Sequence, residues 1–186
     1  MHNWLMKFTR NKPMRLIEIN GDPYLERYHI ASLFGFKIWL HRFIRNDSER
    51  HLHNHPWHAL SVILTGGYRE IVALKGYRNW DIIDYKRGMI NVIKADKTHR
   101  ILQVEPDTWT LMLVSPRVRK NWFFINDDGE KETGKNGGNN WHKTAGNRAE
   151  IYNKRFWDGM KDFDIDINTL RQRVKEWDDV RHEYYN

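Results

Sequence analysis

The chain has 186 residues, 40% of them hydrophobic and 13% aromatic, which is long enough for one compact domain with an extension. It contains no cysteine, and this excludes disulfides, thiolate metal sites and catalysis by a cysteine nucleophile. Residues 156–186 hold five basic and eight acidic residues, so the net charge of +7 leaves +10 on residues 1–155. Such a field favours anionic partners, either a small phosphorylated or carboxylated substrate or a nucleic acid.

The first 15 residues contain scattered apolar positions interrupted by Lys7, Arg10, Lys12 and Pro13. They form neither a secretory hydrophobic region nor a stretch long enough to span a bilayer. We therefore expect a cytoplasmic protein without a membrane partner. Residues 20–23, Asn-Gly-Asp-Pro, then give a strong turn signal, and we expect a β-barrel to begin after them.

Eight short runs rich in β-branched and aromatic residues follow, separated by turn residues. They predict strands over residues 24–30, 37–44, 59–64, 68–74, 80–85, 90–93, 100–104 and 108–114. Eight strands of this kind suit a barrel, so the predicted fold class is all-β.

Residues 126–147 are rich in Gly, Asn, Asp and Lys and lack a hydrophobic period, which predicts a flexible or ligand-ordered loop. Beyond them an apolar stripe with intervals of four and three predicts a helix from about residue 168, which either packs on its own barrel or forms a dimer. The expected organisation is a barrel with N-terminal strands over 1–125, the loop over 126–147 and a C-terminal helical extension over 148–186. The stripe consists of Leu170, Val174, Trp177, Val180 and Tyr184.

Three histidines carry the clearest chemical signal. His53 and His55 are two residues apart, so on one strand their side chains would point to the same face. His99 follows 44 residues after His55, immediately before the predicted strand over residues 100–104. Three imidazoles from two strands would hold a divalent ion from one side and leave positions open for water or substrate. We predict His53, His55 and His99 as metal ligands, and no separate organic cofactor.

Alternation along the strand sharpens this prediction. If the strand from His51 to Leu64 is regular, His51, His53 and His55 face inward with Ala59. His58 then faces outward, as a surface or packing histidine. His51 stays in reserve as a further ligand or as a catalytic residue.

Glu70 is the other candidate near the site. A two-residue turn at residues 66–67 would pair it with Ile63 on the inward face. Ile63 lies eight residues beyond His55, which is roughly 26 Å along a strand at about 3.3 Å per residue. That distance is too long for a shared ion, so three histidines are preferred over two histidines and a glutamate. Bulges are common at barrel rims and could shorten the distance, so Glu70 is kept as a fourth candidate ligand and as a catalytic candidate.

These segments resemble the small cupin proteins. The first cupin motif is Gly, five residues, His-x-His, three or four residues, Glu, six residues, Gly, and the second is Gly, five residues, Pro-x-Gly, two residues, His, three residues, Asn. His53, His55, Gly66, Gly88 and His99 match, whereas Asp47, Ala59, Lys94, Asp96 and Gln103 replace the other motif residues. Over about residues 20–125 the chain is similar to a group of uncharacterised single-barrel cupins of bacteria and phages.

The resemblance implies a cupin-type barrel, a double-stranded β-helix or jelly roll, with a bound metal. Cupins similar to this arrangement include three-histidine thiol dioxygenases, which favours a mononuclear non-haem iron oxygenase acting on a small anionic substrate, with Fe(II) as the metal. The His-x-Asp/Glu pattern of 2-oxoglutarate oxygenases is not met by residues 53–55, His-Asn-His. Small cupins are commonly dimers, so a homodimer is a further expectation. Anion clamps could come from Arg69, Arg100, Arg117 and Arg119.

Two alternatives stay open. A non-redox isomerase, epimerase or lyase would use zinc, manganese or nickel and would need a general base, for which His51 and His41 are candidates. A non-catalytic module that binds a small ligand or a nucleic acid would rely on the charge of the barrel alone. Whether the protein is an enzyme is therefore left open by the sequence, with a metal-dependent dioxygenase as the first hypothesis.

Overall fold

A computed structural model of the chain describes residues 2–19, 22–45, 51–74, 80–125, 131–133, 143 and 145–160. The chain divides into two compact units. One comprises residues 13–145 and contains all the strands found in the described residues; the other combines the N-terminal residues 1–12 with the segment that begins at residue 146.

The larger unit consists of two antiparallel six-stranded sheets. In spatial order, sheet A contains β1 (Met14–Ile19), β2 (Asp22–Leu33), β3 (Phe36–Phe43), β10 (Trp109–Arg117), β5 (Trp57–Thr65) and β8 (Ile90–Ile93). Sheet B contains β12 (Lys131–Thr133), β11 (Phe123–Ile125), β4 (Leu52–His53), β9 (His99–Val104), β6 (Gly67–Ala73) and β7 (Trp80–Lys86).

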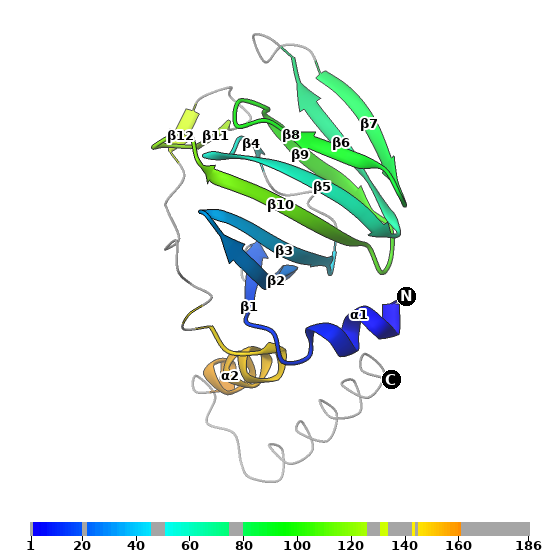
Figure 1. Cartoon of the computed structure of the whole chain (residues 1–186), viewed down its shortest axis with the longest axis vertical. Helices are drawn as coiled ribbons and strands as arrows, with labels where there is room; N and C mark the ends of the chain where they lie inside the picture. The colour runs from blue at the N-terminus through cyan, green and yellow to red at the C-terminus, as the bar shows by residue number, and fades with distance from the viewer. Residues whose placement is uncertain are drawn as a thin grey trace. The chain divides into compact units, whose positions relative to one another are not determined.

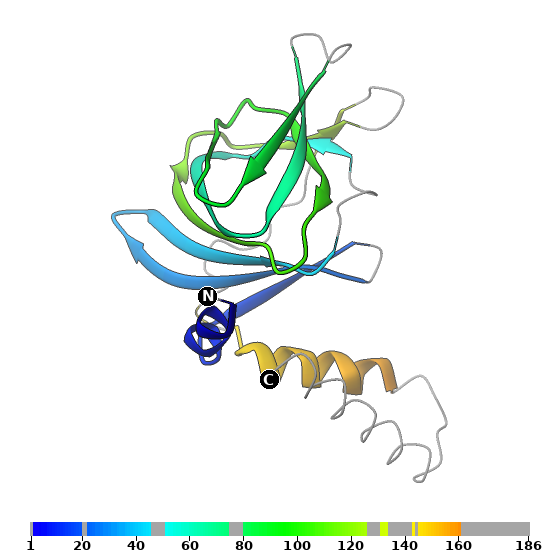
Figure 2. The same ribbon diagram turned by 90° about the vertical axis from the view of Figure 1, so that its right-hand side faces the viewer.

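Successive strands cross repeatedly between the sheets. From β3 to β10 the chain runs A, B, A, B, B, A, B, A, which is the connectivity of a jelly roll. Figures 1 and 2 show these strands curling around a common interior. The predicted all-β, cupin-type barrel is thus confirmed.

Each of the eight predicted strands corresponds to an observed one, β2, β3 or one of β5 to β10. The predicted start of the barrel is wrong, because β1 precedes residue 20 and pairs with β2 along its whole length. β4, β11 and β12 were not predicted, since strands of two or three residues are too short to show a period. β12 lies within the predicted loop, and the apolar stripe after residue 168 lies outside the described residues.

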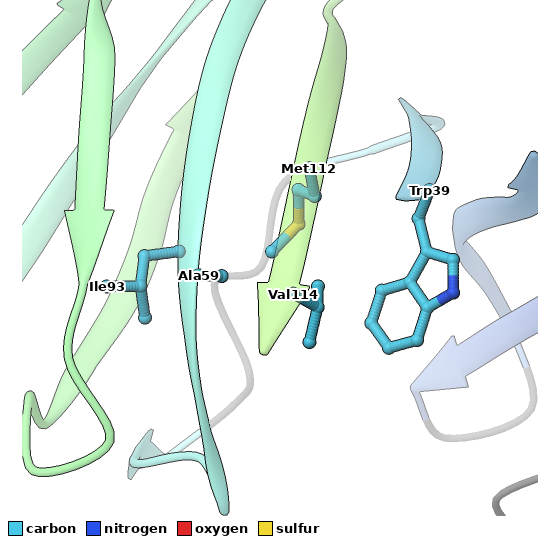
Figure 3. Packing of buried hydrophobic residues seen from close by; sticks show 5 residues of the cluster. All are labelled: Trp39, Ala59, Ile93, Met112 and Val114. Carbon is cyan, nitrogen blue, oxygen red and sulfur yellow. The ribbon is translucent and has the colours of Figure 1, made fainter. Parts of the chain in front are cut away.

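Alternation along the strands of sheet A builds the hydrophobic core. Trp39, Ala59, Ile93, Met112 and Val114 come from four neighbouring strands and pack together. Figure 3 shows that Trp39 turns its six-membered ring toward Val114 and its indole nitrogen away from this cluster.

The smaller unit contains α1 (His2–Thr9) and α2 (Arg148–Met160). Asn147 and Glu150 cap α2 reciprocally, because Asn147 Oδ1 accepts from Glu150 N and Glu150 Oε2 accepts from Asn147 N, each at 3.1 Å. Arg148 is buried and donates to Met6 O and Thr9 Oγ1 of α1. Among the described residues, no helix combines the length and apolar character needed to cross a bilayer.

Candidate metal centre

The histidine-rich segment does not form the single strand that the sequence predicted. β4 ends at His53 in sheet B, and β5 begins at Trp57 in sheet A, so the chain changes sheets over residues 54–56. Asn54 fixes this crossing: its side-chain Oδ1 accepts from Phe123 N, and its own N donates to Phe123 O. The prediction of a regular strand over residues 51–64 is therefore wrong.

The crossing nevertheless brings the three predicted ligands together. His53 of β4 and His99 of β9 are direct cross-strand partners, so their side chains lie on the same face of sheet B. His55 follows beyond the end of β4. The three ring centroids form a nearly equilateral triangle with sides of 5.0, 5.1 and 5.1 Å. One ligand nitrogen from each residue lies within 4.8 Å of the others.

The nitrogen positions suit a shared ion. His55 Nε2 lies 2.9 Å from His99 Nε2. Two nitrogens bound at a right angle to one ion, each at about 2.1 Å, would lie about 3.0 Å apart. His53 and His99 are buried and His55 is half-buried. The arrangement could therefore hold a divalent metal from one side.

Contacts behind the cluster set which nitrogen of each ring faces inward. His53 Nδ1 lies 3.1 Å from the carbonyl oxygen of His51 and donates to it, and His99 Nδ1 donates to Glu70 Oε1. Both Nε2 atoms are thereby left as lone-pair donors for a metal. The structure thus places the backbone carbonyl of His51 in contact with a candidate ligand, His53. The side chain of His51 is half-buried, and the residue lies immediately before β4.

Glu70 belongs to a buried polar network that the sequence did not reveal. Its side chain is fully buried, and besides His99 it accepts from Asn91 Nδ2 at 3.1 Å and from Lys97 Nζ at 2.5 Å. Lys97 also donates to Asn91 Oδ1. We call Glu70, Asn91, Lys97 and His99 the glutamate network. Burial alone would raise the pKa of Glu70, but the hydrogen bond from His99, together with the charge and hydrogen bond of Lys97, lowers it below its ordinary value.

The predicted separation of Glu70 from the site is wrong because the expected hairpin does not exist. At Gly66 the chain leaves sheet A for sheet B, so β6 pairs with β9 and Glu70 lies opposite Ile101 instead of Ile63. Gly66 has φ +61°, and a Cβ there would lie 2.3 Å from Thr108 Oγ1, so no larger residue fits. Glu70 thereby becomes a diagonal neighbour of His99, on the same face.

Aromatic rings extend from the cluster toward sheet A. Trp57 stacks on His55 with centroids 4.2 Å apart, and Trp39 meets Trp57 edge-on at 6.0 Å. The guanidinium of Arg27 lies over the ring of Trp39, 4.3 Å from its centroid. His55 is therefore held by packing, while His53 and His99 are held by hydrogen bonds.

His41 of β3 is buried on the inner face of sheet A. Its Nε2 accepts from Arg27 Nε at 2.9 Å. Burial and then the positive charge of Arg27 place the pKa of His41 well below its ordinary value, so the ring is neutral. Lys37, on the same face, has a lowered pKa because it is partly buried and lies near Arg27 and Arg117. Positive charge thus gathers along this side of the barrel.

The remaining candidates lie elsewhere. His58 is exposed, as predicted, and its Nδ1 accepts from Ala95 N. Arg69 pairs with Asp84 on the surface, Arg117 donates to Lys120 O, and Arg119 is exposed. Arg100 is half-buried. The arginine on the inner face, Arg27, was missed because its position depends on a register between distant segments.

No protein-family model and no curated protein matches the chain. Solved structures do resemble it. KdgF from a Halomonas species is 18% identical, with 55% of this chain and 88% of that chain aligned at a TM-score of 0.43. An RmlC-like cupin from Desulfovibrio desulfuricans is 21% identical over 50% and 83% of the two chains, at a TM-score of 0.39.

HEPD from Streptomyces albus, solved with 2-hydroxyethylphosphonate and Fe(II), is 12% identical and aligns at a TM-score of 0.50. The alignment covers 59% of this chain and 25% of that enzyme, so the chain spans about a quarter of its length. At these identities the likeness concerns the barrel fold alone. The narrower resemblance to bacterial and phage single-barrel cupins stays a prediction.

Proposed function

We propose that this protein is a metal-binding cupin that works as a mononuclear non-haem iron oxygenase on a small anionic substrate. The observation that carries the proposal is the convergence of His53, His55 and His99, with Nδ1 of His53 and of His99 already bonded to protein acceptors. An ion held by three neutral imidazoles keeps its full charge and its open positions, and with iron(II) it would supply chemistry with dioxygen as the oxidant.

The residues around the cluster support this role in distinct ways. Glu70 holds the ring of His99, while Trp57 stacks against His55 and shields one side of it from water. The positive charges of Arg27 and Lys37 would attract an anionic substrate. His51 and Glu70 stay catalytic candidates, but Glu70 already accepts three hydrogen bonds, which disfavours it as a general base.

Elemental analysis tests the proposal. Full-length protein is purified without oxygen or an affinity tag, in wild-type form and as His53→Ala, His99→Ala and His58→Ala. We expect near-stoichiometric iron in the wild type and in His58→Ala, whose histidine is exposed, and at least a tenfold loss in the other two. Oxygen uptake would then be screened with anionic thiols and phosphonates.

Other outcomes have defined meanings. Zinc, manganese or nickel lost in the same pattern would replace the oxygenase with a non-redox isomerase, epimerase or lyase. A wild type without metal, even after each ion is supplied, would contradict metal binding and leave a basic barrel that binds a small ligand or a nucleic acid. A cytoplasmic location stays a prediction.

We further propose that the chain forms a homodimer through the outer face of sheet A. There three neighbouring strands, β8, β5 and β10, present two apolar rows, and five of their six side chains are 36–57% exposed. Roughly 400 Å² of apolar surface results, about half of the 800 Å² that each partner of a standard interface buries. We call this set the outer apolar face: Leu60, Val62, Ile90, Val92, Leu111 and Leu113.

A second copy is the occupant that the uncharged, apolar character of this face favours. The net charge of +7 on each copy opposes association, so the contact has to rest on apolar burial, and none of the six side chains adds a charge to it. We expect a dimer by sedimentation equilibrium and a monomer for Leu60→Glu, which would place like charges opposite each other in a two-fold contact. Glu105→Gln, at an exposed position outside this face, is the control. A monomeric wild type would contradict the proposal.

A further inference from the structure

Arg27 of β2, His41 of β3 and Thr110 of β10 lie in one cross-strand row of sheet A. Side chains in such a row share a face of the sheet. Ile63 of β5 continues the row and packs against Tyr68 of sheet B, so the row faces the interior of the barrel. We call Arg27, His41 and Thr110 the inner row.

Two contacts fix the guanidinium of Arg27. Its Nε donates to His41 Nε2 at 2.9 Å, and its plane lies over the ring of Trp39 at 4.3 Å. A guanidinium carries five N–H donors, so one held in this way can add a hydrogen bond to an oxyanion at little cost in conformational entropy. Arg27 is only half-buried, whereas its two supports, His41 and Trp39, are each 4% exposed.

Two polar atoms on the same face of sheet A as Arg27 have no hydrogen-bond partner in the described part of the chain. They are Trp39 Nε1 and Thr110 Oγ1, in side chains that are 4% and 1% exposed. Thr110 of β10 pairs with His41 of β3, which lies two residues from Trp39 on the same strand. Thr110 and Trp39 are therefore diagonal neighbours on one face of the sheet. Buried polar atoms in folded proteins are almost always paired, and an unpaired one calls for water, an ion or a ligand. Thr98 Oγ1 is a further unpaired atom, and it precedes β9 in sheet B.

The three groups have the same hydrogen-bonding character. An indole N–H and a guanidinium can only donate, and a threonine hydroxyl can donate. We propose that Arg27, Trp39 and Thr110 form a subsite inside the barrel that binds the oxyanion group of a small ligand, a carboxylate or a phosphate. Taking this ligand to be the substrate rests on the proposed function, whereas binding of the anion itself does not.

The surroundings agree with a negatively charged occupant. Lys37 shares the inner face, and its lowered pKa reflects partial burial and then the nearby charges of Arg27 and Arg117. An oxyanion near these groups would be attracted by their positive charges. Trp39 also contacts Trp57, the ring that stacks on His55, so the subsite is one aromatic ring away from the candidate metal ligands. A ligand bound there by its acidic end could extend toward the metal.

Calorimetric titration with inorganic phosphate and with acetate tests the subsite on the full-length, metal-supplied protein. We expect wild type to bind at least one of them, and Arg27→Gln to bind it at least tenfold more weakly. Arg69→Gln, at an exposed arginine paired with Asp84, should bind as wild type does. Thr110→Val should weaken binding several-fold with an unchanged thermal midpoint, so a folding defect in Arg27→Gln would not obscure the result.

The outcomes separate this inference from the metal proposal. In His53→Ala, which should lose the metal, binding of the anion should persist; if it disappears there but survives in Arg27→Gln, the anion binds the metal and the subsite is wrong. A wild type that binds neither anion, or an Arg69→Gln that loses as much affinity as Arg27→Gln, would also overturn it. Metal measured in the same preparations reports on the other proposal independently.

Discussion

The two sides of the barrel interior differ in how far the protein satisfies its own polar groups. In the glutamate network, Glu70 receives hydrogen bonds from Asn91, Lys97 and His99. On the inner face of sheet A, Trp39 Nε1 and Thr110 Oγ1 have no partner among the described residues. The histidine that would bind a metal is therefore oriented by the protein itself, whereas two buried polar atoms on the opposite side stay unpaired among the described residues.

The difference shows why polar residues in a barrel interior have to be judged with their partners. A fully bonded buried network rigidifies its members, and removing one member strands the others. An unpaired polar group already carries its desolvation penalty, so removing it loses nothing. Substitutions on the two sides should consequently change the free energy of unfolding by different amounts, and even in opposite directions, although all the residues are buried.

The largest effect is expected at Glu70. Glu70→Gln keeps the shape of the side chain but removes the charge that pairs with Lys97, so we expect a loss of about 3 kcal/mol in the free energy of unfolding, measured with urea. A misoriented His99 should also lower metal affinity by about 10- to 100-fold in a competition assay with a chelator.

Glu105→Gln is the matched control, since Glu105 is exposed, and both quantities should stay at wild-type values. Equal metal affinity in Glu70→Gln and wild type would mean that the network does not orient His99. The hydrogen bonds on this side of the barrel would then have no role in metal binding.

The sequence predicted the barrel well because its longer strands alternate. β5 exposes His58 and Leu60 and buries Ala59 and Ser61, which is the pattern that periodicity detects. It could not show which sheet each strand joins. In the sequence, a glycine at position 66 is compatible both with a hairpin and with a change of sheet. The structure shows a change of sheet, with Thr108 close against Gly66.

The three histidines were accessible to sequence reasoning because motif spacing survives a break in the strand. Glu70 was misplaced because a straight strand at about 3.3 Å per residue was assumed, while the chain in fact doubles back into the other sheet. Arg27 was overlooked because it faces His41 across two strands, and no local sequence pattern shows which residues of the two strands lie opposite each other. The capping box of Asn147 and Glu150 was visible in the sequence and could have placed the start of α2.

Two threonines offer a matched pair for the second prediction. Thr108 is fully buried, accepts from Gly67 N at 3.0 Å and donates to Glu105 O at 2.7 Å. Thr108→Val leaves Gly67 N without its partner, so it should cost about 1–3 kcal/mol of unfolding free energy. Thr110→Val removes an unpaired hydroxyl and should change stability by less than about 0.5 kcal/mol or raise it. Equal losses in urea unfolding would show that Thr110 is already satisfied, and the contrast would fail.

The smallest effect concerns pH. His41 is buried and its pKa is lowered well below the ordinary value, by burial first and by Arg27 second, so it stays neutral in the folded chain. The unfolded chain takes up this proton near pH 6.5, hence the contribution of His41 to stability is complete above that pH and is lost as the pH falls below it.

Between pH 7 and pH 5.5 this single group should remove about 1 kcal/mol from the free energy of unfolding. His41→Gln keeps an acceptor for Arg27 Nε but cannot titrate, so the wild type should approach the variant in stability by that amount as the pH falls. His29→Gln, at a half-buried histidine whose Nε2 lies 2.8 Å from Ser32 Oγ, should keep the wild-type slope. Parallel curves for wild type and His41→Gln would mean that His41 takes up its proton near the same pH in the folded chain as in the unfolded chain. Arg27 could then not donate to Nε2, and the inner row would lose the contact that orients it.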